Sequence, residues 1–505
     1  MDRSNPEAFQ RSKVPGSDFL QLRAEEAPRG GLAEWLARRL RAAIADGRLP
    51  VGSRLPATRV LAGELQVSRG VVTEAYQRLT EDGHVAGRGR NGTVVVAAPP
   101  PQPPPAERPA ASARSPVFDG PPGADVFDRL RAVPARIDLS PGLPDLSAFP
   151  RTAWLRAERA VLDGLSAPDL GYGDPRGSET LRRAVSRWLA RNRGIRADPD
   201  EVLIVAGVAQ ALGLIAQVLR DDGTGAAAVE DPGSLGTRQH LRHWGLDTPP
   251  VPVDGEGVRV DALRSSGAPA VVLTPAHQFP TGVVLGGERR RELLRWAGEG
   301  GLVVEDDYDA EHRYDRPPVP ALRSLLAERV CYTGSVSKLL APALRIGWIL
   351  PPAGHREALI EAKRYADLGS AALPQLVLAR LMDSGGLERH LRTLRGRHRR
   401  RRDAVIAAVR RHLPGARVHG AAAGLHLMVT FEGPAGGPGD CSHLDDTAVA
   451  AAALARGVTV HPLSWHAQRP HPPGLVLGYA ARTPAVLAEG VAVLGEEVRR
   501  LRGTG

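Results

Sequence analysis

One lysine in this chain stands out by its rarity and its surroundings. Of 66 basic residues only three are lysines, and one of these, Lys338, ends the segment "VCYTGSVSK" over residues 330–338. A lysine amine can form a Schiff base with an aldehyde, whereas an arginine guanidinium stays protonated and delocalised. Because the sequence otherwise favours arginine so strongly, a lysine kept at this position indicates covalent chemistry on a carbonyl compound.

Two side chains upstream suit the ring of one such compound, pyridoxal 5'-phosphate (PLP). Strand alternation in "VVEDDYD" (303–309) places Asp306 and Tyr308 on one side. The acid can pair with the pyridine nitrogen and the phenol can reach the ring oxygen, as PLP chemistry requires. Acids at a strand end are also common as loop or cap residues, so this pair alone does not decide the function.

The phosphate of PLP has its own candidate partners. Ser335, Ser337 and Arg345 flank the lysine and suit a dianion, with arginine able to bind it through two hydrogen bonds. "AGVAQALGL" (206–214) predicts a turn into a helix, whose first N–H groups, near Val208 and Ala209, also favour phosphate. Each feature has an ordinary structural explanation, but their joint occurrence in this order favours a PLP site.

The elements that must position these residues alternate between strands and helices. Short apolar segments predict buried strands at "DEVLIVAG" (200–207), "GAAAVEDP" (225–232), "PAVVLTPAH" (269–277), "GLVVEDDYD" (301–309) and "RVCYTGSVS" (329–337). Amphipathic runs such as "ERRRELLRWAGEGG" (288–301) lie between them. This pattern predicts an α/β fold with a mostly parallel central sheet and a ligand site at the carboxyl ends of the strands.

The first hundred residues have a different character. Helical patterns over 32–49, 56–65 and 66–83, with Thr58 and Ser68 as possible N-caps, precede a glycine-rich basic hairpin over 84–96. This arrangement is typical of a winged helix-turn-helix, whose third helix enters the DNA major groove. Ser68 and Arg69 would then face phosphates and base edges, and Arg88 and Arg90 would extend the wing. A small helical domain with a solvated basic face is the alternative.

Composition supports this division of the chain. The net charge is +10, and residues 29–96 hold 11 arginines against 6 acids, about half of the excess. We predict a DNA-binding domain over 24–97, a Pro/Ala-rich linker over 98–135 and a large domain over 136–502, with a small C-terminal subdomain from about 390. Two cysteines, no secretory signal pattern, no metal-type spacing and no membrane-length apolar run favour the cytoplasm and predict neither a metal site nor a membrane partner.

The N-terminal sequence resembles a known family of bacterial regulators. Residues 46–95, "DGRLPVGSRLPATRVLAGELQVSRGVVTEAYQRLTEDGHVAGRGRNGTVV", resemble the DNA-binding domain of the GntR family. The resemblance implies binding to a double-stranded DNA operator and marks Arg54, Arg59 and Arg69 as DNA contacts.

The remainder resembles fold-type I aminotransferases over about residues 136–500. The matching stretches include "LSPGLPDLSAFP", "TPAHQFPTG", "VVEDDYDAEHRY" and "YTGSVSKLLAPALRIGW". Together with the N-terminal match they resemble the MocR group, in which a GntR-type reader is fused to an aminotransferase-like domain. The resemblance implies Lys338 as the internal aldimine lysine of PLP, Asp306 as the pyridinium partner and Tyr308 as the partner of the ring oxygen. It also implies a domain-swapped homodimer in which Tyr172 reaches the neighbouring subunit's phosphate.

Three positions depart from the aminotransferase pattern. Phe279 replaces an asparagine in "FPTG", Ser234 replaces a common aromatic, and Val476 in "GLVLGYA" replaces the arginine that binds the substrate carboxylate. A valine cannot bind a carboxylate, and Arg482, six residues later, is expected to face elsewhere. We therefore expect a PLP-dependent transcriptional regulator that senses PLP or a PLP–amine adduct. The alternatives are an active aminotransferase with an accessory reader, and a DNA-binding protein whose large domain is only a dimerisation scaffold.

One further segment, "LERHLRTLRGRHRRRRDAVIAAVRRHL" (387–413), contains ten arginines. We expect a solvated basic helix leading into the small subdomain, with additional non-specific DNA contact as the alternative.

Overall fold

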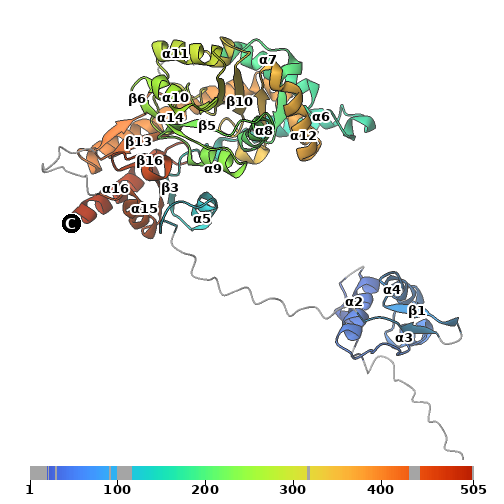
Figure 1. The fold of residues 1–505 in the computed structure, drawn as a ribbon. Helices are drawn as coiled ribbons and strands as arrows, with labels where there is room; N and C mark the ends of the chain where they lie inside the picture. Colours follow the sequence, from blue (N-terminus) through green and yellow to red (C-terminus); the bar gives the residue numbers. More distant parts are fainter. Residues whose placement is uncertain are drawn as a thin grey trace, which may run out of the picture. The chain divides into compact units, whose positions relative to one another are not determined.

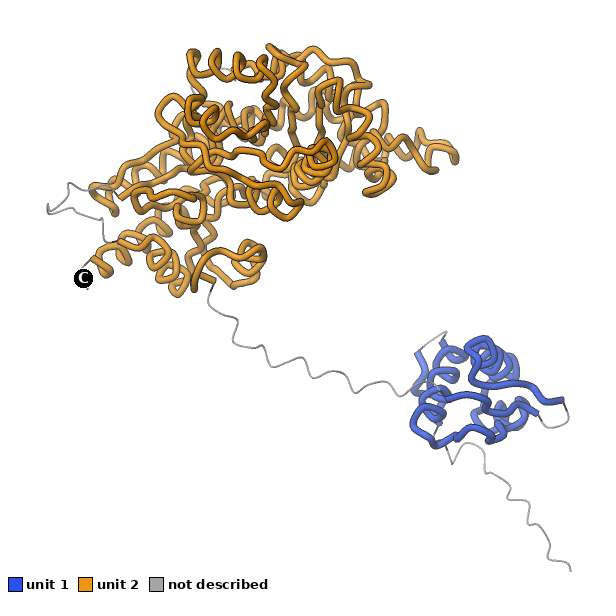
Figure 2. The backbone as a smooth tube through the Cα atoms, viewed as in Figure 1, with its two compact units in different colours: residues 1–114 blue, residues 115–505 orange. Residues whose placement is uncertain are grey.

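The computed structural model describes residues 20, 22–28, 31–89, 92–98, 117–314, 319–431 and 444–502. Its chain divides into two compact units, residues 1–114 and 115–505, which Figure 2 shows in separate colours. Among the described helices, none combines the length and the apolar character needed to cross a membrane.

Unit 1 is a winged helix-turn-helix, as predicted. Its elements are α2 (Leu32–Ala45), α3 (Thr58–Glu64), α4 (Arg69–Glu81), β1 (Val85–Gly87) and β2 (Thr93–Val95), the last two pairing antiparallel. The apolar stripe of α2, including Leu36 and Leu40, is buried in the core of the unit. Ser68 occupies the N-cap of α4 as expected, but the prediction for Thr58 was wrong: Ala57 is the N-cap of α3, and Thr58 is its first helical residue.

The core of unit 2 is a large sheet surrounded by helices (Figure 1). Eight strands of the described chain form it, in the order β4 (Leu203–Val205), β11 (Gly347–Leu350), β10 (Val330–Ser335), β9 (Leu302–Asp307), β8 (Ala270–Leu273), β5 (Ala227–Asp231), β6 (Pro250–Asp254) and β7 (Gly257–Val258). The strands from β10 to β6 are parallel, whereas β11 and β7 pair antiparallel with their neighbours. The mostly parallel sheet predicted from the sequence is confirmed.

Helices cover both faces of this sheet because neighbouring strand residues alternate between two apolar cores. Val304 of β9 packs in a core with residues of α8 (Val208–Asp221), whereas Val303 enters a second core with residues of α11 (Gly287–Gly298). The other helices of this part are α6 (Arg151–Leu162), α7 (Glu179–Arg193), α9 (Leu235–His243), α10 (Val260–Ser266), α12 (Arg356–Asp367) and α13 (Ala372–Asp383). The carboxyl ends of β9 and β10 thus lie side by side at the same end of a sheet that helices cover on both faces.

The small subdomain has its own four-stranded sheet among the described residues. Its strand order is β12 (Arg417–His419), β13 (His426–Thr430), β16 (Gly474–Gly478) and β15 (His461–Pro462), and its helices are α14 (Gly386–His412), α15 (Asp446–Ala455) and α16 (Pro484–Arg502). Two elements from before the large sheet join this subdomain. Strand β3 (Ile137–Asp138) pairs parallel with β14 (Val458–Thr459), and α5 (Val126–Ala132) packs Val126 and Leu130 into the same core.

The predicted linker over 98–135 is therefore shorter in the structure. Residues 117–135 are part of unit 2, and apolar side chains spaced four apart give α5 a buried face within it. The proline-rich composition that suggested a linker applies to residues before this helix.

The expectation of a solvated face was wrong for part of α14. Arg401 is 8% exposed and donates hydrogen bonds to Asp145 and to the Ala480 carbonyl. Arg399 donates to the Tyr314 carbonyl, and the Arg402 guanidinium lies 4.9 Å from the centre of the Tyr314 ring. These arginines join the helix to neighbouring segments of unit 2.

Candidate functional site

A cavity of about 330 Å³ lies beyond the carboxyl ends of β9 and β10. Eight of the nine residues predicted for the cofactor line it: Asp306, Tyr308, Ser335, Ser337, Lys338, Arg345, Val208 and Ala209. They come from positions as far apart in the chain as α8 and the segment after β10, so only the fold could bring them together. Ligands of α/β folds bind beyond the carboxyl ends of the parallel strands.

Lys338 lies just after β10, with its amine enclosed by the cavity. Its Nζ donates a hydrogen bond to the Gly142 carbonyl oxygen. Gly142 has φ +81°, and a Cβ at this position would lie 2.9 Å from Nζ, so a side chain here would displace the lysine. Burial lowers the pKa of the Lys338 ammonium, although the nearby carboxyls of Asp309 and Asp306 oppose this. A lowered pKa increases the share of neutral amine, which is the nucleophilic form.

Asp306 and Tyr308 line the same cavity from the end of β9. Burial raises the pKa of the Asp306 carboxyl to about 7, and the adjacent Asp307 adds to this. A cation placed beside Asp306 would reverse the effect, because an opposite charge favours the ionised carboxyl. Burial also raises the pKa of Tyr308, which keeps its phenol neutral and able to donate a hydrogen bond.

A buried group that sequence reasoning missed supports Tyr308. This group is the His277 ring. Tyr308 Oη lies 3.1 Å from Nδ1 of His277, and the same nitrogen lies 2.9 Å from Asp309 Oδ2. The side-chain nitrogen and oxygen atoms of His277, Asp309 and His426 that could bind a metal ion lie within 4.8 Å of one another. Each of the three side chains already forms a hydrogen bond, because Nε2 of His426 lies 3.2 Å from the Pro280 carbonyl oxygen. The cluster thus fixes the wall of the cavity behind the Tyr308 phenol.

The other end of the cavity suits a phosphate. Helix α8 begins there at Val208, after Gly207 with φ +90°. A Cβ on Gly207 would lie 3.1 Å from Nη1 of Arg345, so glycine lets the guanidinium approach the helix N-terminus. Within the described ranges no carboxylate pairs with Arg345. Guanidinium groups, serine hydroxyls and helix N–H groups are the kinds of donor that bind a dianion.

Tyr172 is the one predicted cofactor residue outside the cavity. It is 98% exposed, just after the short helix Ala167–Leu170, and Leu155, Leu162 and Leu170 nearby are also exposed. The segment around α6 projects from the body of unit 2 in Figure 1. The role predicted for Tyr172 involves a second subunit, so it stays a prediction.

The three residues that depart from the aminotransferase pattern, Phe279, Ser234 and Val476, occupy different places in the fold. Ser234 is the N-cap of α9, where its Oγ accepts a hydrogen bond from the Thr237 N–H, and it lines the cavity together with Phe279. Val476 does not line the cavity. It is fully buried in a small apolar cluster with Met428 and Leu463, and Phe279 packs against this cluster. The strand position expected to hold a substrate-binding arginine is therefore part of the hydrophobic core.

The cavity also includes lining residues that the sequence did not single out: Gly142, Thr274, Pro342, Leu425 and His426. Gly142 has a signal in retrospect, because it lies in "LSPGLPD", one of the stretches that resemble aminotransferases.

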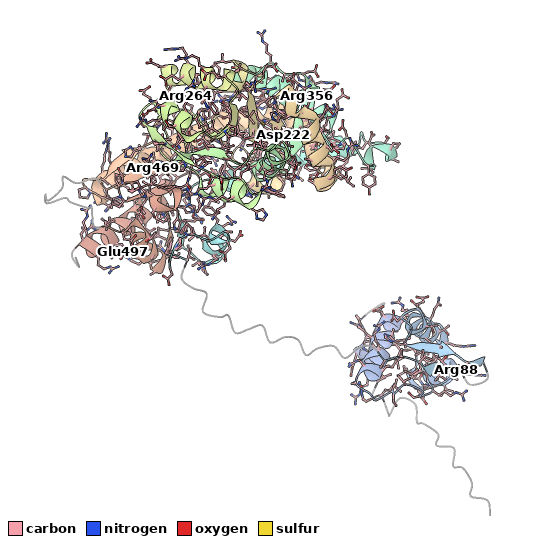
Figure 3. The ribbon with its side chains drawn as sticks, viewed as in Figure 1. Arg88, Asp222, Arg264, Arg356, Arg469 and Glu497 are labelled. Carbon is pink, nitrogen blue, oxygen red and sulfur yellow. The ribbon has the colours of Figure 1, made fainter. Side chains whose placement is uncertain are left out.

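On unit 1, the predicted DNA contacts are exposed. This holds for Arg54, Arg59, Ser68, Arg69 and Arg88, whereas Arg90 lies outside the described residues. Figure 3 labels Arg88 near the hairpin of unit 1. Arg69 Nε lies 3.4 Å from Thr58 Oγ1, which joins the starts of α3 and α4.

Ion pairs separate two kinds of arginine on this unit. Four arginines bind acids of the same unit: Arg39 with Glu26, Arg41 with Asp82, Arg48 with Asp46, and Arg78 with Glu34 and Glu74. Arg59, Arg69 and Arg88 have no such partner in the part of the chain that the structure describes. Their charges are available to phosphates.

Comparisons with known proteins agree with both units. Residues 32–95 match the family of bacterial regulatory proteins called gntR, and residues 136–494 match aminotransferase class I and II. The probable rhizopine catabolism regulatory protein MocR of Rhizobium meliloti is 32% identical over 487 residues, which cover 93% of this chain and 94% of that protein. The chain belongs to the MocR-type regulators.

Other relatives of this MocR-type chain span both units or the large one. The HTH-type pyridoxine biosynthesis transcriptional regulator PdxR of Corynebacterium glutamicum is 29% identical, over 79% of this chain and 83% of that protein. The α-aminoadipate aminotransferase LysN of Thermus thermophilus, solved as a complex with N-(5'-phosphopyridoxyl)-L-leucine, has a TM-score of 0.67. It is 28% identical, and the match covers 75% of this chain and 95% of that one.

PLP is the cofactor of this fold, and the cavity fits it. The lining combines a lysine whose pKa is lowered with a carboxylic acid and a guanidinium, which are the kinds of group that PLP requires.

Proposed function

We propose that this protein is a transcriptional regulator whose operator binding responds to PLP or to an adduct of PLP with an amine. The observation that carries the proposal is that eight predicted cofactor residues line one cavity, whereas Val476 is 0% exposed outside it and holds no charge for a substrate carboxylate. A missing arginine of this kind removes a charge-assisted hydrogen bond that aminotransferase chemistry relies on.

We assign roles to the residues of the cavity. Lys338 is the covalent attachment site, Asp306 holds the proton on the pyridine nitrogen, and Tyr308 donates to the ring oxygen. Bound PLP supplies an aldehyde carbon that a neutral amine can attack. The phosphate is held by Ser335, Ser337, Arg345 and the first N–H groups of α8, at Val208 and Ala209.

The functional unit in this proposal is a domain-swapped homodimer in the cytoplasm, where the chromosome of a bacterium lies. Exposed apolar side chains on the segment that carries Tyr172 support a contact with a second copy. In such a dimer, Tyr172 of one subunit would reach the phosphate of the other. Ligand binding changes operator affinity only if the ligand favours one arrangement of the two reader domains over another.

The cofactor part is tested with an absorbance spectrum of the purified full chain. The wild type with added PLP should show a near-visible band that Lys338→Ala and Lys338→Arg both lack. The arginine variant is the matched control, because it keeps the positive charge but cannot attach the cofactor. A wild type without a lysine-dependent band would remove PLP attachment from the proposal.

The regulatory part needs two further measurements. Operator affinity should differ between protein with and without PLP, and a panel of α-amino acids should give no sustained transamination. Sustained turnover of an ordinary amino acid would instead favour the alternative, an active aminotransferase with an accessory reader.

A further inference from the structure

A second cavity adjoins the cofactor cavity. Its volume is about 640 Å³, and it shares Ser234 and Phe279 with the first cavity as lining residues. Its other walls come from α5 and parts of residues 133–143 on one side, and from His461, His466 and Arg482 of the small subdomain on the other. We propose that this cavity is the subsite for the anionic end of an effector amine, bound by Arg482 and His461. The inference rests on the proposed function, because the amino group of the effector is taken to reach the cofactor.

Arg482 supplies an available cation. It lies shortly after β16, it is exposed, and among the residues that the structure describes it has no ion-pair partner. The expectation that Arg482 faces elsewhere is correct for the first cavity but not for the second. Arg131, also on the lining, is already paired with Asp128. The described lining includes one acid, Asp138, whose Oδ1 accepts a 2.9 Å hydrogen bond from the Ser140 N–H.

His461 supplies a neutral donor. The Leu235 N–H lies 3.4 Å from Nδ1 of His466, so this nitrogen accepts, and the proton of His466 is on Nε2. That Nε2 lies 3.4 Å from Nδ1 of His461, which therefore accepts in turn and leaves the His461 proton on its own Nε2. Burial lowers the pKa of His461 to about 3 and that of His466 well below its usual value, so both rings are neutral. His461 thus offers an N–H to a ligand in the cavity.

The two cavities together define the shape of the ligand. An α-amino acid carries its carboxylate beside its amine, but the strand position for that carboxylate is the buried Val476. An amine that carries its anionic group several carbons away can reach from the cofactor past Ser234 and Phe279 to Arg482. Apolar lining residues such as Leu130 and Leu143 suit the methylene chain between the two ends.

The position of the second cavity next to α5 also gives a reason why a bound ligand would change operator binding. Helix α5 forms one wall of the subsite, and it is the first helix of unit 2 after the segment that follows unit 1. A ligand that fills the cavity would therefore contact the element closest in sequence to the connection between the units.

The test is isothermal titration calorimetry on the PLP-loaded full chain with three matched probes. 6-Aminohexanoate carries its carboxylate at the far end, L-norleucine is its isomer with the carboxylate beside the amine, and hexylamine lacks the carboxylate. Wild type should bind 6-aminohexanoate more tightly than either of the others. Arg482→Gln should weaken 6-aminohexanoate about tenfold or more and leave hexylamine unchanged, because the substitution removes only the interaction with the carboxylate.

Two controls keep this test specific. Arg264→Gln removes an exposed arginine on α10 that is paired with Glu299 and is not on the lining of either cavity, so it should change none of the three affinities. Each variant should retain the wild-type cofactor band. Equal binding of 6-aminohexanoate by wild type and Arg482→Gln, or tighter binding of L-norleucine, would overturn the subsite. No binding of any amine would overturn the subsite and the amine part of the proposed function, while a PLP-dependent change in operator affinity would still stand.

Discussion

Asp306 and Asp307 are neighbours in the chain, but their carboxyl groups serve opposite sides of strand β9. Asp306 lines the cofactor cavity. Asp307 accepts a 2.7 Å hydrogen bond from Tyr332 Oη and pairs with Arg193, and the side chains of Asp307 and Arg193 are both 1% exposed. The alternation of a strand thus places one acid in the site and the other in an ion pair that holds α7 against the sheet.

Replacing each acid should therefore have a different effect. Asp306→Asn should weaken PLP binding with little change in the free energy of unfolding, because no ion pair among the described residues depends on it. Asp307→Asn leaves the buried Arg193 charge without its partner and should cost about 3–5 kcal/mol of stability. PLP titration and urea unfolding of the cofactor-free proteins would measure the two effects. Equal destabilisation by both variants would contradict this division.

Restoring the aminotransferase arginine should not restore an aminotransferase. Val476→Arg would place a charge in a fully buried cluster with Met428, Leu463 and Phe279, none of which can pair with it. An unpaired buried charge is strongly destabilising, so we expect a loss of several kcal/mol in the free energy of unfolding. Urea unfolding together with a transamination assay checks this. A stable variant that turns over α-amino acids would show that the strand can accept the arginine.

Arginines of unit 1 that have no acidic partner among the described residues should contribute most to DNA binding. Arg59→Gln, Arg69→Gln and Arg88→Gln should each weaken operator binding, and removing one phosphate contact should reduce the salt slope of binding by about one. Arg48→Gln is the matched control, because Arg48 is an exposed arginine of the same unit that is paired with Asp46. A larger decrease in affinity for Arg48→Gln than for the other three would contradict the assignment.

Tyr172 should change the affinity for PLP only when the protein is a dimer. Its side chain is 98% exposed within one subunit, so Tyr172→Phe should leave the stability of the fold unchanged. If the hydroxyl reaches the phosphate of the partner, PLP affinity should fall about tenfold, as expected for one charge-assisted hydrogen bond. PLP titration at protein concentrations above and below the dimer dissociation constant would test this. Unchanged affinity in the dimer would remove Tyr172 from the site.

Buried histidines should make the fold sensitive to acid. Burial, with His312 nearby, lowers the pKa of His398 to about 2, and burial lowers that of His312 to about 4. Both are therefore neutral in the folded protein at pH values where the unfolded chain, with a histidine pKa near 6.5, takes up protons. The stabilisation is complete above about pH 6.5 and is lost as the pH falls, towards 4 for His312 and towards 2 for His398.

His398→Leu isolates this effect, since no described residue hydrogen-bonds either ring nitrogen of His398. The free energy of unfolding should fall less steeply between pH 6.5 and 5 than in wild type, by at most about 1.4 kcal/mol per pH unit. Buried acids with raised pKa, such as Glu230 and Glu305, act in the opposite direction but are common to both proteins. Identical pH slopes for wild type and variant would contradict the prediction.

The sequence by itself determined the class of both units and predicted eight residues that line the cavity. The place of Lys338, Asp306, Tyr308 and Arg345 on one cavity was predictable because PLP requires particular functional groups, and strand alternation and turns place those groups locally. The strands of the sheet were predictable for a similar reason, since short apolar runs bounded by turn residues have few other stable arrangements. These are properties of residue types over short distances along the chain.

Tertiary structure decided which charges are free and which residues meet. Burial of Arg401 against Asp145, 256 residues away, could not be read from a run of arginines that resembles a solvated helix. The same holds for Arg482, whose place on the second cavity depends on how α5 and the small subdomain pack together. Pairing and cavity lining depend on contacts between distant segments, and periodicity along the chain contains no information about such contacts.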